Sequence, residues 1–552
     1  MARLRAATVG DLGETVAVPR YDRDQVQVGI VHFGAGAFHR SHQAAYIDQL
    51  MNDGLAMDWG ICAVDVLPAD GPKAEVFAAQ DGLYTLMIKH ADGAIEPRVI
   101  GSIVEYLFAP DTPGQVLARL ADPRIRVVTL TITEGGYNFR PATGEFNAGN
   151  EAVQRDLSST GAPETVFGLV IDGLRRRRAA GVPPFTIASC DNIQGNGDIA
   201  RSMFAAFADL AEPGLGAWVR AAVSFPNSMV DRITPVTTAE DIGRLQAEVG
   251  ITDAWPVVCE PFRQWVLQDR FPNGRPPLEL CGVQLVTDVT PYELMKLRLL
   301  NCSHQALGYA GYLAGYRHVH EAAADPVFAS FLTGYMQREA RPTLPVVPGV
   351  DLDEYIATLL SRFSNPAVKD TLARLCAASS DRIPKWLVPV IRHNLADGGA
   401  VARSATVVAS WARYAEGADE QGKPIDVVDP LRDEVMTLAR RQHEEPLSFL
   451  ANEHLFGGPG RARPLHRGLP GCPGLVPPTW RPRDPAAHQP GKSVDDNNGV
   501  PVASRRARFR EAPRRAGGRL HRAGAGHLPV RGPVLPRDRA RGRGARPSLL
   551  PG

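Results

Sequence analysis

The sequence has few cysteines, and their spacing argues against two kinds of site. It contains no C-x-x-C pair and no Cys/His spacing typical of a zinc site. We therefore expect neither a bound metal nor a disulfide framework, and irregularly spaced, unpaired cysteines are typical of a reducing compartment. The seven cysteines are Cys62, Cys190, Cys259, Cys281, Cys302, Cys376 and Cys472.

Long hydrophobic runs are also missing. No apolar stretch approaches the roughly 18 residues that are needed to span a bilayer. The N-terminal residues M-A-R-L-R-A-A-T-V-G-D-L lack the apolar segment of a signal peptide. These absences predict a cytoplasmic protein with no membrane partner.

A dinucleotide-binding motif is present, but without its usual third glycine. The apolar run V-G-I-V-H-F at 28–33 predicts a strand, and G-A-G-A-F-H-R-S-H-Q follows it. Gly34 and Gly36 would let the backbone turn and approach a pyrophosphate at the N-terminus of a helix beginning near His42. A lone G-x-G is also common turn punctuation, so this motif is weak when taken alone.

Acidic residues follow the next predicted strand, W-G-I-C-A-V-D-V at 59–66. Asp65 ends this run and Asp70 comes shortly after it. Either carboxylate could bind an adenosine ribose hydroxyl and would repel a 2′-phosphate. The pattern favours NAD over NADP, although an aspartate in a surface loop is the ordinary alternative.

The segment E-L-M-K-L-R-L-L-N-C-S-H brings together a potential base, an amide and an imidazole: Lys296, Asn301 and His304. At about 100° per residue these side chains fall at about 0°, 140° and 80° on a helix, so they share one side. The surrounding leucines would bury that helix, and burial lowers the pKa of a lysine toward the range of a general base. The alternative interpretation is that these three side chains are structural groups whose hydrogen bonds are satisfied within the protein.

The preceding T-P-Y-E has the form of a capping box. It predicts Thr290 as N-cap, Pro291 at the first helical position and Glu293 reaching back to the cap. A helix should therefore begin here.

Five motifs in unbroken order carry a family resemblance, which extends from about Tyr21 to Phe456. The chain resembles the long-chain mannitol dehydrogenase family, the polyol-specific long-chain dehydrogenases. The motifs are G-A-G-A-F-H-R-S-H-Q, T-I-T-E-G-G-Y at 131–137, S-C-D-N at 189–192, S-F-P-N-S-M-V-D-R-I-T-P at 224–235 and K-L-R-L-L-N-C-S-H.

The resemblance implies a zinc-independent oxidation of a polyol to a ketose with NAD, such as D-mannitol to D-fructose. It makes Lys296 the general base, and Asn192 and Asn301 the amides that hold the developing alkoxide. It also implies that His304 orients the substrate oxygen or the lysine, and that Glu134 helps the base to exchange its proton with solvent.

The resemblance also implies binding residues. Asp231 and Arg374 would bind hydroxyl groups of the polyol, and Arg382 replaces a lysine of the family, keeping the charge but not the geometry. This change bears on the contact at the far end of the polyol. The cofactor-binding residues would be Gly34, Gly36, Phe38, His39, Arg40 and Asp70.

Other substrates remain open at this point. A sister enzyme acting on arabinitol or sorbitol differs in one or two hydroxyl orientations, which the sequence does not resolve. A hexuronate reductase is a more distant alternative, because related uronate enzymes tend to carry lysine where Gly135 stands.

Alternating strand and helix patterns predict the fold. Candidate strands are 28–33, 59–66, 125–133, 185–190 and 221–225, and a helix is expected over 163–178. This alternation favours an α/β, Rossmann-like, doubly wound domain over 1–285. Helical patterns at 324–336, 352–363 and 405–414 predict a mainly α-helical domain over 286–456, with the active site between the two.

The composition changes sharply after Phe456. Residues 457–552 contain 20 Lys/Arg and 5 Asp/Glu, a net charge of +15, against 41 and 55 in residues 1–456, a net charge of −14. The Pro/Gly/Arg-rich text predicts a disordered tail, of the kind that a reading-frame shift in a GC-rich gene would produce. The non-enzyme alternative is an impaired product whose basic tail binds polyanions. We expect no specific nucleic-acid partner, and we interpret the arginines at 175–178 as a solvated helix end.

Overall fold

The computed structural model describes residues 2–12, 16–140, 143–159 and 161–457. The tail predicted for 457–552 lies outside the described residues, apart from Gly457. The strands are β1 Ala2–Arg3, β2 Val28–Phe33, β3 Gly60–Asp65, β4 Tyr84–Lys89, β5 Ile95–Ile100, β6 Ile103–Phe108, β7 Val127–Leu130, β8 Thr186–Ser189, β9 Ser228–Asp231, β10 Ile251–Thr252, β11 Val257–Cys259, β12 Gln264–Gln268 and β13 Gln284–Val286.

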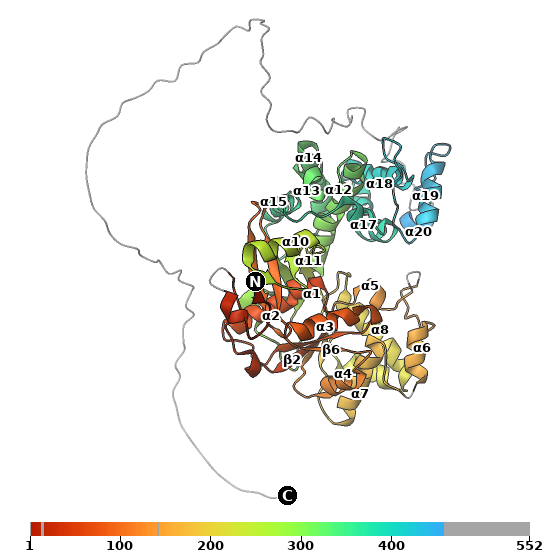
Figure 1. The fold of residues 1–552 in the computed structure, drawn as a ribbon. Helices are drawn as coiled ribbons and strands as arrows, with labels where there is room; N and C mark the ends of the chain where they lie inside the picture. The colour runs from red at the N-terminus through yellow and green to blue at the C-terminus, as the bar shows by residue number, and fades with distance from the viewer. Residues whose placement is uncertain (1, 13–15, 141–142, 160, 458–552) are drawn as a thin grey trace, which may run out of the picture. The chain divides into compact units, whose positions relative to one another are not determined.

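Helices fall into an N-terminal and a C-terminal set (Figure 1). The N-terminal set is α1 Ala37–Ser41, α2 Gln43–Asn52, α3 Gly71–Ala79, α4 Pro113–Ala121, α5 Thr133–Gly136, α6 Glu151–Ser158, α7 Val166–Ala179, α8 Asn196–Ala211, α9 Leu215–Ala222 and α10 Ala239–Arg244. The C-terminal set is α11 Thr290–Met295, α12 Cys302–Leu313, α13 Val319–Ala324, α14 Pro326–Tyr335, α15 Leu352–Phe363, α16 Leu372–Cys376, α17 Ser379–Asp397, α18 Ala402–Ala415, α19 Arg432–Arg441 and α20 Glu453–Phe456.

A five-stranded parallel sheet organises the N-terminal region, in the order β6-β3-β2-β7-β8. Chain order reverses between β2 and β7, so the sheet is doubly wound, and ligands of such sheets bind at the carboxyl ends of the strands at this reversal. Gly34 and Thr131 directly follow the two strands. The predicted nucleotide motif therefore lies at the expected edge.

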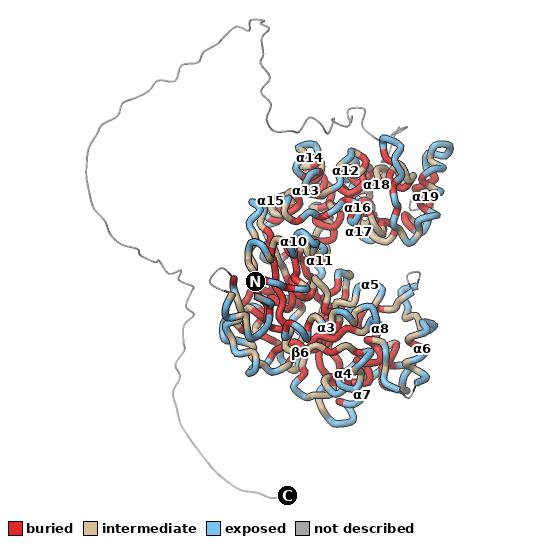
Figure 2. The backbone as a smooth tube through the Cα atoms, in the orientation of Figure 1, coloured by how far each residue is buried: buried red, intermediate tan, exposed pale blue. Residues whose placement is uncertain are grey.

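Both faces of this sheet are buried, which is why its strands read as nearly continuous apolar runs. Along β2, Ile30 packs with α2 on one face, whereas Val31 and Phe33 pack with α4, α7 and α8 on the other. Figure 1 shows α2 and α3 on one side of β2 and β6, and α4 and α7 on the opposite side. In Figure 2 the buried residues run through these strands.

Four of the five predicted strands contain the observed β2, β3, β7 and β8. The fifth prediction, a strand at 221–225, is wrong. Residues 221–225 form the end of α9 and a loop, and the strand β9 begins only at Ser228. A short buried apolar run does not distinguish a helix end from a strand. Ser224 nevertheless accepts a hydrogen bond from the β8 amide of Ile187 (2.9 Å), as a sixth strand would.

The C-terminal helices share one hydrophobic core, which includes Leu307, Tyr335 and Trp411 and extends to Met229 of β9 and Val266 of β12. The predicted helix at 352–363 matches α15 residue for residue, and α14 and α18 lie within the other two predicted segments or extend them by a few residues. The predicted class, a Rossmann-type sheet domain with a mainly helical C-terminal domain, is confirmed. The boundary predicted at 285/286 stays a prediction.

The arginines at the end of α7 are only partly solvated. Arg175 and Arg176 pair with Asp172, but Arg177 is buried and donates to three backbone carbonyls, including that of Asp122 (2.7 Å). A solvated helix end is therefore wrong for Arg177. Its hydrogen bonds connect α7 to the end of α4 and to the residue that follows it.

In the described residues, no helix is long and apolar enough to cross a membrane.

Candidate active site

Lys296 lies in a buried pocket where the helical region meets the strands. Its side chain is 7% exposed, and its Nζ donates to Asn192 Oδ1 (2.7 Å) and to the Val230 carbonyl (2.6 Å). Asn192 follows β8, and Val230 belongs to β9. Residues 296, 230 and 192 are thus brought together by tertiary contacts rather than by sequence.

Burial lowers the pKa of Lys296 below its usual value. The carboxylate of Asp231 opposes this effect, whereas the guanidinium of Arg362 adds to it. A lowered pKa increases the fraction of neutral amine at neutral pH, which is the form that a general base needs.

The backbone from Lys296 to Asn301 is π-helical, between the α-helices α11 and α12. The predicted spacing of 100° per residue therefore does not hold for Lys296 and Asn301. Single π-helical turns inside α-helices occur frequently at functional sites. Here the wider turn carries both candidate catalytic side chains.

Two buried polar atoms on the helical segment that begins at Lys296 have no hydrogen-bond partner among the described residues: Asn301 Nδ2 and His304 Nε2. Neither residue is among those that line the Lys296 pocket, and Asp231 interacts electrostatically with both Lys296 and His304. His304 packs against the Phe363 ring, with 4.8 Å between the ring centroids, and its enclosure lowers its pKa to about 3, so the ring is neutral. Buried polar groups are almost always satisfied. A substrate oxygen is the kind of ligand that would satisfy these two.

Glu293, rather than Glu134, is the glutamate that lines the Lys296 pocket. The predicted capping box is wrong: Thr290 is the first residue of α11, its amide donates to Asp288 Oδ1 (2.9 Å), and Glu293 Oε1 accepts from the Gly195 amide (3.0 Å). Burial raises the pKa of Glu293 to about 7. The T-P-Y-E pattern indicated a helix start but gave the wrong role to this glutamate.

Glu134 lies in α5 and is 44% exposed. It pairs with Lys385 of α17, at 2.8 Å between Oε1 and Nζ, and it is not among the residues that line the Lys296 pocket. Its predicted part in proton exchange stays a prediction.

Two of the sequence motifs are joined by Asp191, which the sequence reasoning did not single out. Its carboxylate accepts from the amides of Ile132 and Thr133 (3.2 and 2.8 Å) and from the Tyr137 hydroxyl (2.7 Å). Thr133 has a φ of +62°, a conformation that is strained for a β-branched residue. Asp191 therefore holds the strained T-E-G-G-Y turn next to Asn192.

The predicted substrate-binding residues are all engaged by other groups. Asp231 is buried and paired with Arg362, and Arg374 pairs with Asp370 (Nε–Oδ1 2.6 Å). Arg382 donates to the carbonyls of Leu375 (3.2 Å) and Arg374 (3.4 Å). Arg374 is close enough to lower the pKa of His304, which places it near that imidazole. Roles in substrate binding stay predictions.

The glycines after β2 differ in what they require. Gly34 has a φ of +93°, and a Cβ there would lie 2.2 Å from the Thr131 carbonyl oxygen, so only glycine fits. At Gly36 a Cβ would have only the Gly34 oxygen near it, at 4.0 Å. The space beside Gly36 is thus open for the backbone approach that a pyrophosphate needs.

The helix after this turn begins earlier than predicted, at Ala37 instead of near His42, where α1 breaks and α2 follows. Asp65 is buried and accepts from the Ala35 amide (3.0 Å), which fixes the turn. Asp70 pairs with Lys73 at 2.5 Å. Of the two acids, Asp70 is the more accessible one, and its contact with a ribose stays a prediction.

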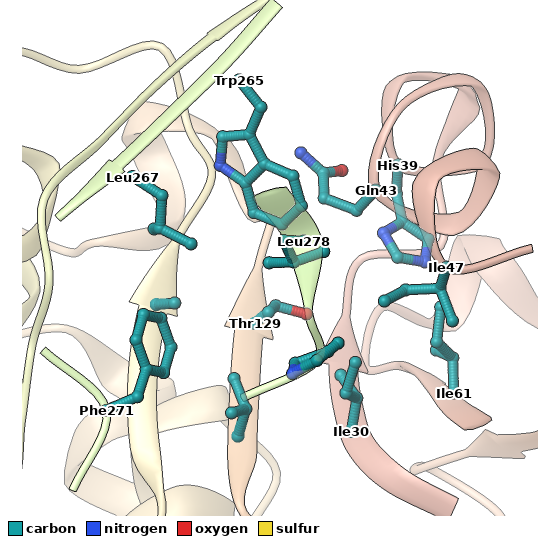
Figure 3. A pocket seen from close by; sticks show the side chains of 13 residues that line it. Ile30, His39, Gln43, Ile47, Ile61, Thr129, Trp265, Leu267, Phe271 and Leu278 are labelled. Carbon is teal, nitrogen blue, oxygen red and sulfur yellow. The ribbon is translucent and has the colours of Figure 1, made fainter. Parts of the chain in front are cut away.

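Arg40 and His39 of α1 point into the protein. The Arg40 guanidinium donates to the Trp255 carbonyl (2.6 Å) and lies 3.5 Å from the centroid of that indole ring. His39 lines a separate small cavity with Gln43 and Trp265 (Figure 3), about 20 Å³ in volume, which shares no lining residue with the Lys296 pocket. Both His39 and Arg40 are buried. Cofactor contacts by Phe38, His39 and Arg40 stay predictions.

Within the described residues, no group of three or more His, Cys, Asp or Glu side chains is arranged to hold a metal ion. The six cysteines in that part of the chain are free and buried.

Comparison with known families agrees with this geometry. Residues 28–280 match the mannitol dehydrogenase Rossmann domain, and residues 288–464 match the mannitol dehydrogenase C-terminal domain. The chain belongs to the mannitol dehydrogenase family. The resemblance seen in the sequence is confirmed, and with it the class of enzyme, a polyol oxidoreductase.

Similar proteins cover most of the chain. A mannitol 2-dehydrogenase of Phaeosphaeria nodorum is 46% identical over 447 residues, 80% of this chain and 78% of its own length. One of Aspergillus fumigatus is 46% identical over 451 residues, 81% of this chain and 90% of its own.

Two solved structures are similar over the whole described fold. Pseudomonas fluorescens mannitol 2-dehydrogenase, in a ternary complex with NAD and D-mannitol, has a TM-score of 0.77 and 45% identity, covering 85% of this chain and 96% of its own. D-sorbitol dehydrogenase in substrate-free form has a TM-score of 0.74 and 37% identity, covering 81% and 99%.

Proposed function

We propose that this family member oxidises a secondary alcohol of a polyol to a ketose with NAD, D-mannitol to D-fructose, and catalyses the reverse reduction. The observation that carries the proposal is the buried Lys296, held by Asn192 and Val230, on the same helical segment as the unpartnered nitrogens of Asn301 and His304. The Pseudomonas fluorescens relative, solved with NAD and D-mannitol, supports the cofactor and the substrate.

Lys296 is the general base in this proposal. The neutral amine takes the proton of the substrate hydroxyl, and the resulting ammonium keeps its bonds to Asn192 Oδ1 and the Val230 carbonyl. A positioned base contributes about 10²- to 10⁴-fold to turnover. No metal takes part.

The two asparagines stabilise the charge that develops on the substrate oxygen. Asn192 accepts a hydrogen bond from Lys296 through Oδ1, which leaves its amide nitrogen to donate to the substrate oxygen. Asn301 Nδ2 has no partner and can donate to the same oxygen. Each such donor is worth about 3 kcal/mol in a transition state. The neutral His304 orients the same oxygen.

The Gly34–Gly36 turn, fixed by Asp65, would hold the pyrophosphate of NAD, and Asp70 the adenosine ribose. Bound NAD supplies the acceptor for the hydride that leaves the alcohol carbon. Glu293 lies in the pocket with Lys296 and has a pKa near neutrality, so it is placed to pass the proton onward.

The test is a panel of polyols and ketoses with NAD and NADP, followed by absorbance of the reduced cofactor. D-mannitol with NAD should be among the best pairs. Preference for NADP by about tenfold, a difference of about 1.4 kcal/mol, or reaction with hexuronates alone would refute the proposal.

Lys296→Ala supplies the matching test of mechanism. It should remove most turnover while NADH affinity stays unchanged, and Lys423→Ala, at an exposed lysine, is the control. Near-normal turnover of folded Lys296→Ala would refute the base assignment.

Oxidation of D-sorbitol is the second candidate. It is favoured by the similarity to D-sorbitol dehydrogenase, and the same panel distinguishes the two.

A further inference from the structure

Arg362, at the end of α15, joins two buried carboxylates of the strand region. Its Nη1 and Nη2 donate to Asp231 (2.8 and 3.0 Å), and its Nε and Nη2 donate to Glu260 (3.0 and 2.7 Å). The three side chains are 5%, 6% and 2% exposed. One cation thus bridges two anions, and these three side chains carry a net charge of −1. The buried guanidinium of Arg232 adjoins them and donates to the Glu260 carbonyl (3.0 and 2.9 Å).

The guanidinium group is needed for this geometry. Four donor contacts to two carboxylates require the planar fork of arginine, which a lysine ammonium does not provide. The Phe262 ring lies 3.9 Å from the guanidinium carbon and covers it. The four donor contacts and the Phe262 ring thus constrain the orientation of the guanidinium group.

This network fixes the backbone on which Lys296 depends. Asp231 directly follows Val230, whose carbonyl accepts from Lys296 Nζ (2.6 Å). Glu260 accepts from the Ile233 amide (2.6 Å), so Arg362 holds the segment 230–233 through side chains at both of its ends. A displacement of Arg362 would move the carbonyl that positions the amine.

The network also sets the charge next to Lys296. The charged groups that face the lysine are Asp231 from β9, Arg362 from α15 and Glu293 from α11, and Asp231 in turn is near His304 of α12 and Tyr355 of α15. Asp231 favours the ammonium form of Lys296, and Arg362 favours the neutral amine. Together with burial and with Glu293, these two charges influence how readily the amine accepts a proton.

We propose that Arg362 is a positioning residue for the reaction: it holds Asp231 and the Val230 carbonyl in place and supplies the cation that offsets Asp231 beside Lys296, which sets the pH range of catalysis. The inference rests on the proposed function, because it is read through Lys296.

The experiment compares the pH profile of kcat/KM for D-mannitol and NAD in three variants. Arg362→Met leaves a charge of −2 on the network, and the acidic limb, below which Lys296 is protonated, should move to higher pH by about one unit, the size of shift that a nearby charge produces. Glu260→Gln leaves a charge of 0, and the limb should move to lower pH. The double variant returns the charge to −1, and its limb should lie near that of the parent protein.

A purely structural role predicts something different, namely lower turnover in every variant with the limb unmoved. That result, or shifts of the same direction in Arg362→Met and Glu260→Gln, would overturn the inference. If Arg362→Met does not fold, Glu260→Gln alone decides, since an unshifted limb in that variant contradicts the proposal.

NADH affinity, measured by fluorescence titration, shows whether each variant is folded. Failure of the proposed function is seen separately, as turnover retained by Lys296→Ala in the same assay.

Discussion

Replacing Glu293 with glutamine tests the carboxyl group in the Lys296 pocket. Burial raises the pKa of Glu293 from its ordinary 4.5 to about 7. This difference corresponds to about 3 kcal/mol, at about 1.36 kcal/mol for each pH unit. Glutamine keeps an oxygen that can accept from the Gly195 amide but carries no charge.

The sign follows from the raised pKa. The folded protein binds this proton more tightly than the unfolded chain, so the free energy of unfolding falls as the pH rises from 4.5 to about 7 and levels off above that. Glu293→Gln has no titrating carboxyl group at this position, so its free energy of unfolding does not fall in this way. We expect it to be more stable than the parent by up to about 3 kcal/mol above pH 7, and equally stable below pH 4.5.

Thermal unfolding followed by circular dichroism over this pH range measures the effect. Glu354→Gln, at an exposed position in the first turn of α15, is the control for the substitution itself. A constant difference between Glu293→Gln and the parent, or a variant that is less stable at high pH, would refute the reasoning. In the assay of D-mannitol oxidation the acidic limb should move to lower pH, because the charge of Glu293 favours the ammonium form of Lys296.

Three further variants test the cofactor turn and the alkoxide site. Gly36→Ala should fold normally, because the nearest atom to the new Cβ is 4.0 Å away, but it should bind NADH more weakly in a fluorescence titration; unchanged affinity would place the cofactor elsewhere. Gly34→Ala should instead lower the yield of folded protein, since its Cβ meets the Thr131 oxygen at 2.2 Å. Asn301→Ala should lower kcat by about 10²- to 10³-fold with NADH affinity retained, and a loss seen in KM alone would contradict its role at the transition state.

Much of the fold follows from local sequence patterns. β2 and α15 match their predicted ranges residue for residue, because β2 is buried on both faces and α15 begins at an Asp351 cap and carries a clear helical stripe. The segment at 221–225 was read wrongly because its buried Val223 and Phe225 look alike in a helix end and in a strand. Local patterns therefore predicted regular elements well and their ends less well.

The site was predicted only where a motif carried it. Lys296, Asn192 and Asn301 were named from family motifs, but Arg362 was not, since its partners lie 131 and 102 residues away in the sequence. The available signal was an arginine on the apolar side of an amphipathic helix. This pattern does not reveal which carboxylates the arginine contacts. The π-helical turn at Lys296–Asn301 also escaped, because its residues have ordinary helical propensities.

The charges around Lys296 bear on which substrates the site accepts. Asp231 and Glu260 outnumber Arg362, Arg374 is already paired with Asp370, and Gly135 offers no cation. A carboxylate substrate near Lys296 would therefore meet a buried negative charge without a free counterion among these groups, at a cost that buried ions seldom recover. Of the predicted binding residues, Arg382 is the cation whose hydrogen bonds go to backbone carbonyls. A neutral polyol meets no such cost, and its hydroxyls can satisfy Asn301 Nδ2 and His304 Nε2, which are otherwise buried without partners. The negative charge of these groups and the unpartnered nitrogens are therefore two reasons to expect a polyol rather than a hexuronate as the substrate.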